Sequence, residues 1–163
     1  MERERRPQVT ASTPIGLLER LFIVLGAGVG LAALDLHVKS VLVTPAWAYH
    51  HRSDTWFVVC IVTLVGALAI ARVPSLGVSI GSGLLSGGVL GNLVSADRDG
   101  GSVPDPLIVV TRWGGVAFNA ADVFTILGIG VLVGSLMAYA IRNRDRLRPP
   151  TRAERWLLRR LGR

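Results

Sequence analysis

Four long apolar blocks constrain the fold of this chain more than any other feature of its sequence. They span about Leu17–Leu36, Trp56–Ala71, Leu76–Val94 and Val123–Ile141, and the fourth block carries no charged residue. A helix needs about 20 apolar residues to cross the hydrocarbon of a bilayer. The sequence therefore predicts an all-α membrane protein built on a four-transmembrane-helix bundle. Buried helices of a soluble protein are the alternative.

Arginines gather at the ends of these blocks, and the net charge of the chain is +7. The positions are Arg3, Arg5 and Arg6 before the first block, Arg72 between the second and third, and Arg142, Arg144, Arg146 and Arg148 after the fourth. Because positive residues favour the cytoplasmic side, we expect a multi-pass protein with both termini in the cytoplasm. Residues 37–55 and 95–122 then lie outside. Arginines that flank apolar spans favour membrane lipids as partners and no nucleic acid.

The same pattern divides the chain into three parts. We expect a basic cytoplasmic N-terminal segment over 1–16, a membrane domain over 17–141 and a basic cytoplasmic tail over 142–163. The first apolar block is long and lacks a clear cleavage site, so we expect it to remain as an anchor. The tail ends in TRAERWLLRRLGR. This pattern is typical either of an amphipathic helix on the membrane surface or of a solvated basic tail.

Glycines and extended stretches predict how the domain packs. Small residues allow close approach of helices in lipid. The candidates are Gly26 and Gly30 in the first block, Gly83, Gly87 and Gly91 in the third, and Gly130 and Gly134 in the fourth. Residues 41–49 and 107–113 read as extended, and Gly114–Gly115 after the second stretch is a turn signal. We therefore expect a compact bundle with a small extracytoplasmic β-sheet on the bilayer surface.

Polar residues collect where the helices are expected to reach the outer face. They are Asp35 and Lys39, Asn92, the loop residues Asp97, Arg98, Asp99 and Asp105, and finally Asn119 and Asp122. Polar groups that enter a membrane often mark function. A structural interpretation stays open, because Asn119 can cap the last helix and Asp122 can stabilise its first turn. Asp35 and Lys39 can likewise form an ordinary pair one helical turn apart.

Three motifs together resemble the lipoprotein signal peptidases, also called signal peptidase II. The segment GNLVSADRDGGSVPD over Gly91–Asp105 resembles the family's Gly-Asn-Leu…Asp-Arg…Gly-x-Val-x-Asp block. FNAAD over Phe118–Asp122 resembles its Phe-Asn-x-Ala-Asp motif, and DLHVK over Asp35–Lys39 resembles its Asp-x-x-x-Lys motif. The resemblance covers about residues 17–141. It implies a four-helix membrane aspartic endopeptidase with a small extracytoplasmic sheet.

The resemblance also implies roles for particular residues. Asp105 and Asp122 stand at the positions of the two catalytic aspartates. The substrate-binding or supporting positions are Asn92, Arg98, Asn119, Asp35, Lys39 and Asp97. Such an enzyme lies in the bacterial plasma membrane with its active site at the outer face. It removes signal peptides from diacylglyceryl-modified prolipoproteins, cutting before the lipidated cysteine with water activated by the two aspartates. We expect prolipoprotein substrates and membrane lipids as partners, a monomer, and no cofactor or metal.

The sequence departs from the family pattern in two places. Three residues separate Leu93 from Asp97 where the family usually has one, and one residue is missing between Arg98 and Gly101. RSDTWF over Arg52–Phe57 replaces the family's Asn-x-Gly-Ala-Ala-Phe type block, with Arg52 where the asparagine is expected. These departures leave open a catalytically degenerate relative that binds lipoprotein precursors or lipid without cleaving them.

Two further alternatives come from other classes of protein. His37, His50, His51 and Asp54 suggest a small metal site outside the membrane, but adjacent histidines rarely point at one metal and no metal-binding spacing supports them. A transporter or channel is the other alternative. It usually needs charged residues in the middle of the membrane or helices broken by paired Gly and Pro, and the apolar blocks offer neither.

Overall fold

A computed structural model describes residues 16–112, 114–147, 156 and 159–160. The basic segment over 1–15 lies outside these residues, and so does most of the tail. The expected amphipathic helix of the tail falls largely on that part of the chain, so it stays a prediction.

The described residues form four main helices in the predicted order. They are α1 (Leu17–Val41), α2 (Asp54–Ile70), α3 (Leu76–Arg98) and α4 (Ala120–Arg142), and a short α5 (Arg144–Leu147) follows. Three of them, α1, α3 and α4, are long and apolar enough to cross a membrane. α2 has 17 residues, so its length of about 26 Å falls a little short of the hydrocarbon core.

Two helices run further than the apolar pattern predicts. α1 continues to Val41 rather than ending near Leu36, and α3 continues to Arg98 rather than ending near Val94. Hydropathy indicates how much of a segment can lie in the hydrocarbon of the bilayer. The helix itself continues until its backbone hydrogen bonds end. As a result, Asp97 and Arg98 belong to the last turn of α3 and not to a loop.

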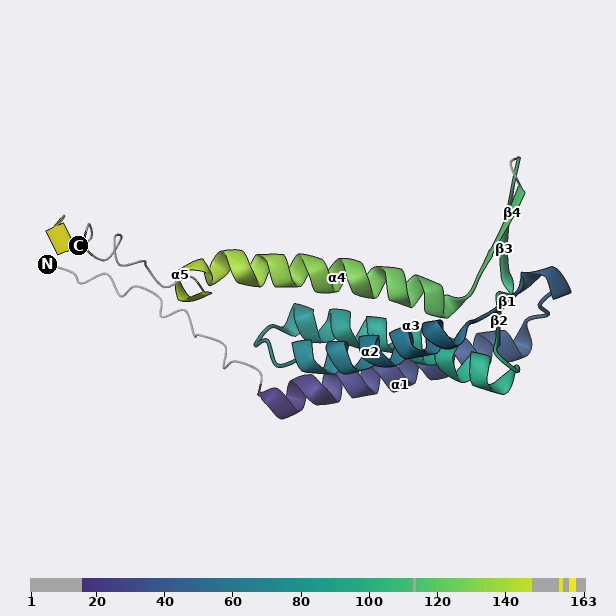
Figure 1. The fold of residues 1–163 in the computed structure, drawn as a ribbon, viewed down its shortest axis with the longest axis horizontal. Coiled ribbons are helices and arrows are strands. Elements are labelled where there is room, and N and C mark those ends of the chain that lie inside the picture. Colours follow the sequence, from purple (N-terminus) through teal and green to yellow (C-terminus); the bar gives the residue numbers. More distant parts are fainter. Residues whose placement is uncertain (1–15, 113, 148–155, 157–158, 161–163) are drawn as a thin grey trace, which may run out of the picture.

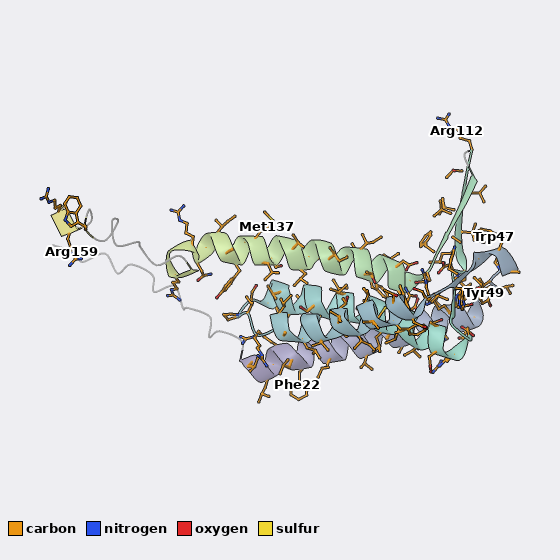
Figure 2. All side chains as sticks on the ribbon, viewed as in Figure 1. Phe22, Trp47, Tyr49, Arg112, Met137 and Arg159 are labelled. Carbon is orange, nitrogen blue, oxygen red and sulfur yellow. The ribbon has the colours of Figure 1, made fainter. Side chains whose placement is uncertain are left out.

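The outside of the bundle is apolar. Phe22 on α1 is 74% exposed and Met137 on α4 is 60% exposed, and both point away from the other helices (Figure 2). A soluble protein rarely exposes apolar surface of this extent, whereas lipid solvates it well. The chain is therefore a multi-pass membrane protein.

α3 is the central helix and packs against α1, α2 and α4 (Figure 1). Its predicted glycine stripe faces α1. A Cβ atom added at Gly87 would lie 2.6 Å from Cβ of Leu31, and one added at Gly91 would lie 2.8 Å from Oδ2 of Asp35. The absence of side chains at these positions lets α1 and its polar end approach α3.

The glycine predictions for the other helices are wrong. Gly26, Gly30, Gly130 and Gly134 all face open space, with no atom within 4 Å of an added Cβ. Spacing reveals that small residues share a face but does not reveal which face meets a neighbour. The contact between α3 and α4 instead uses Gly81, Gly88 and Gly128.

Replacing Gly81 by alanine should destabilise the protein by about 1–3 kcal/mol, because overpacking forces the backbone of α4 away. An added Cβ would lie 2.5 Å from the backbone nitrogen of Leu132. Gly130→Ala is the matched control, since its Cβ enters open space and stability should not fall. Unfolding in detergent measures both. Equal stability of the two variants would contradict this packing.

A buried arginine connects α1 to the C-terminal end of α2, at the end of the bundle opposite the sheets. Arg20 of α1 is only 8% exposed, and its Nε donates a hydrogen bond of 3.2 Å to the carbonyl oxygen of Ala71. The last carbonyl groups of a helix lack partners within it, so a buried guanidinium there satisfies them.

Two small antiparallel sheets lie at the end of the bundle away from the start of α1 and the end of α4 (Figure 1). β1 (Tyr49–His51) pairs with β2 (Ser102–Pro104), and β3 (Leu107–Thr111) pairs with β4 (Gly114–Phe118). The extended stretch predicted over 107–113 is confirmed in β3. The β3–β4 hairpin projects from the helices with Arg112 at its tip (Figure 2).

The extended stretch predicted over 41–49 is wrong. Val41 ends α1, a single 3-10 turn covers Ala46–Ala48, and only Tyr49 belongs to a strand. Pro45 cannot donate a hydrogen bond to a sheet, and it stands directly before the 3-10 turn. The single predicted sheet is thus two separate two-stranded sheets.

Candidate functional site

Asp105 lies buried between the two sheets. It follows β2 directly, and its backbone N–H donates a hydrogen bond of 3.0 Å to the carbonyl oxygen of Ala48. Pairing of β2 with β1 aligns Pro104 with Tyr49, so Asp105 lies beside the start of β1. The residue is only 3% exposed. A carboxyl group buried to this degree needs polar partners.

Asp122 lies in the first turn of α4, where Asn119 is the N-cap. Oδ1 of Asn119 accepts a hydrogen bond from the backbone N–H of Asp122, and Oδ2 of Asp122 accepts one from the N–H of Asn119. This capping box confirms the cap that the sequence allowed. The helix N-terminus also favours negative charge at this position.

Asn119 connects the two aspartates. Besides capping α4, its Nδ2 donates a hydrogen bond of 2.5 Å to Oδ1 of Asp105. The residue is fully buried at the junction of β4 and α4. Among the described contacts no hydrogen bond joins the two carboxyl groups directly, so each is held by a different part of the same asparagine.

α1 and α3 extend this network. Nδ2 of Asn92 donates a hydrogen bond of 3.0 Å to Oδ1 of Asp122, and Oδ1 of Asn92 accepts one of 2.8 Å from Nζ of Lys39. Nζ of Lys39 lies 2.7 Å from Oδ2 of Asp35, one helical turn earlier. Oδ1 of Asp35 accepts a hydrogen bond from the N–H of Ala121, so α1 also helps to cap α4.

The structure therefore brings together six of the eight residues that the sequence proposed for the site: Asp35, Lys39, Asn92, Asp105, Asn119 and Asp122. The other two, Asp97 and Arg98, are exposed in the last turn of α3. Neither side chain makes a hydrogen bond or an ion pair to any described residue. Their placement follows from the extra turn of α3, which the sequence analysis assigned to a loop.

His50 also belongs to the site, although its sequence context suggested only a metal ligand. Its Nδ1 lies 2.5 Å from Oδ2 of Asp105. Arg52, the residue expected to replace the family's asparagine, instead places its guanidinium over the ring of Trp56, 5.3 Å from the ring centroid. Little in the sequence indicated that His50 belongs to the site. The contact between His50 and Asp105 depends on the pairing of β1 with β2, which lie about fifty residues apart in the chain.

Metal binding finds no support among the described residues, which contain no group of three His, Cys, Asp or Glu side chains placed to hold an ion. The chemistry available at the site is that of carboxyl groups. A buried carboxylate accepts protons as a base, and a buried carboxylic acid donates them. Two such groups are held by one asparagine, and an imidazole contacts one of them, Asp105, so the arrangement is suited to proton transfer.

Comparison with known proteins finds a solved structure with a similar fold. No protein-family model matches the chain, and no curated protein matches it. A solved structure described as a bacterial membrane enzyme matches with a TM-score of 0.56 and 16% sequence identity, over 78% of this chain and 93% of that chain. The chain thus has a fold similar to that of a bacterial membrane enzyme.

Proposed function

We propose that the protein is a membrane aspartic endopeptidase of the lipoprotein signal peptidase type. It would remove signal peptides from diacylglyceryl-modified prolipoproteins by cutting before the lipidated cysteine. The observation that carries this proposal is the attachment of Asp105 and Asp122 to one buried asparagine, Asn119. The three motifs that resemble the family supply all of the residues in this arrangement.

The proposed reaction uses the two carboxyl groups in opposite states. In this scheme Asp122 acts as the carboxylate and Asp105 acts as the acid. The helix N-terminus favours Asp122 as the carboxylate that takes a proton from the attacking water. Asp105 then donates a hydrogen bond to the carbonyl oxygen of the substrate and a proton to the leaving nitrogen. This scheme needs no metal and no covalent intermediate.

The position of the site fits a substrate that lies partly in the bilayer. The arginines that flank the apolar blocks favour the cytoplasm for the end of the bundle opposite the sheets. The aspartates would then lie at the outer face, where the scissile bond of a lipidated precursor emerges. Val110 is 82% exposed in β3. Trp47 is 58% exposed and lies beside the sheets (Figure 2). Both are suited to contact lipid or the diacylglyceryl group.

A second candidate function is binding of lipoprotein precursors without cleavage. The exposed positions of Asp97 and Arg98 favour it, since the family resemblance assigns both to the site. In that case the polar network would be a structural device that joins α1, α3 and α4, and the aspartates would be dispensable for any chemistry.

A cleavage assay distinguishes the two functions. The full chain in detergent would be incubated with a prolipoprotein peptide that carries a diacylglyceryl-cysteine, and mass spectrometry would locate the cut. We expect hydrolysis of the bond before the modified cysteine, with little cleavage of the same peptide without lipid. Binding of the lipidated peptide without any cleavage would reject the peptidase and support the second candidate.

A further inference from the structure

The pair formed by His50 and Asp105 spans the boundary between the buried site and solvent. The histidine side chain is 49% exposed, whereas the aspartate side chain is 4% exposed. Their atoms Nδ1 and Oδ2 are 2.5 Å apart. The imidazole can therefore exchange protons with water while it contacts a carboxyl group that water barely reaches.

Other charged groups stand further from this imidazole. Across the β1–β2 sheet, His50 pairs with Val103, which carries no charge. From α4, Asp122 reaches the pair only through Asn119. From α1 and α3, the ion pair of Lys39 and Asp35 reaches it only through Asn92 and Asp122. Among the described residues, Asp105 is thus the one titratable side chain with which the imidazole of His50 forms a hydrogen bond or ion pair.

We propose that His50 is a positioning residue that supplies protons to Asp105. Turnover then needs one proton to be held by His50 and Asp105 together. This inference rests on the proposed peptidase function. In the reaction, water attacks the carbonyl carbon and gives a proton to Asp122. The proton of the His50 imidazolium passes to Oδ2 of Asp105, breaking an N–H bond and forming an O–H bond. Asp105 then protonates the amide nitrogen as the C–N bond breaks.

The cycle closes without any other reactant. Asp122 releases the proton that it took from water, and the exposed imidazole takes one proton from solvent. One water molecule is consumed and one peptide bond is broken. The histidine thereby provides the path by which a buried carboxyl group is reprotonated after each turnover.

The sign of the pH dependence follows from this role. Imidazole loses its proton as the pH rises, in the range between about pH 5 and 8. The rate should therefore fall as the pH rises and the imidazolium that supplies the proton is lost. Without the imidazole, the proton must come from a carboxylic acid, which ordinarily ionises at lower pH than imidazole. Removing the imidazole should therefore move the falling limb of the plot of rate against pH to lower pH.

His50→Asn is the decisive variant. The amide nitrogen of asparagine lies close to the place of Nδ1 and still donates a hydrogen bond to Oδ2 of Asp105, but it does not titrate. We expect the falling limb of kcat against pH to move by about one unit towards acid, which is about a tenfold loss of rate above the limb. At pH values below the limb the loss should be smaller, because Asp105 can then take its proton directly from solvent.

His51→Asn is the matched control. His51 lies next in the same strand, and its ring faces Gly101 rather than the carboxyl groups. The pH profile of this variant should be that of wild type. His50→Ala removes the hydrogen bond as well, so it should be slower at every pH.

A wild-type pH profile in His50→Asn would overturn the inference and leave His50 as a hydrogen-bonding residue only. That outcome differs from failure of the peptidase function, in which wild type does not cleave the lipidated peptide. In that second case, nitrogen NMR of the His50 ring tests the pair without turnover. The Nδ1 resonance should change in Asp105→Asn, and an unchanged resonance would reject the contact itself.

Discussion

Asp105→Asn and Asp122→Asn should each lower the rate of prolipoprotein cleavage by about 10³-fold or more. Each substitution keeps the shape of the side chain but removes the group that accepts or donates the reacting proton, which typically contributes about 10²–10⁴-fold to the rate. The two losses should not add in the double variant, because the carboxyl groups act as one unit. The measurement is kcat for the lipidated peptide in detergent.

Asp99→Asn is the control for this prediction. Asp99 is an exposed aspartate that ends α3, outside the polar network. Its variant should cleave within about twofold of wild type, since exposed substitutions away from a site have small effects. Thermal unfolding of all variants would separate loss of chemistry from loss of fold. Folded Asp105→Asn and Asp122→Asn proteins with wild-type rates would reject the aspartic mechanism.

Lys39→Met should cost about 3–5 kcal/mol of stability, because it leaves a buried carboxyl group without its charge partner. The side chain of Lys39 is 4% exposed and that of Asp35 is 0% exposed, with 2.7 Å between Nζ and Oδ2. The loss would weaken the attachment of α1 to the start of α4, since Asp35 also caps Ala121. Unfolding in mixed detergent measures the change in free energy.

The double variant Asp35→Asn with Lys39→Met isolates the pair. Asparagine at position 35 still accepts the hydrogen bond from Ala121 and carries no charge, so most of the lost stability should return. If Lys39→Met unfolds like wild type, then the pair is no more than the ordinary surface pair one helical turn apart that the sequence allowed.

The helices and their order could be predicted from the sequence, because apolar blocks of membrane length have few other solutions. The cap of α4 was also readable, since Asn119 and Asp122 have the spacing of a capping box. The packing role of the glycines could be predicted only in part. Their spacing marks a shared face, as for Gly83 and Gly87, but in α4 the stripe of Gly130 and Gly134 proved to face away from the bundle.

The sequence by itself determined a four-helix membrane bundle and most of the polar residues at its sheet end, because hydropathy and capping are local properties of the chain. Only the tertiary structure decided that Asp97 and Arg98 stay in solvent and that His50 meets Asp105. The second contact depends on the register of two strands about fifty residues apart. Because α2 and α3 lie between these strands in the chain, no local pattern encodes their pairing.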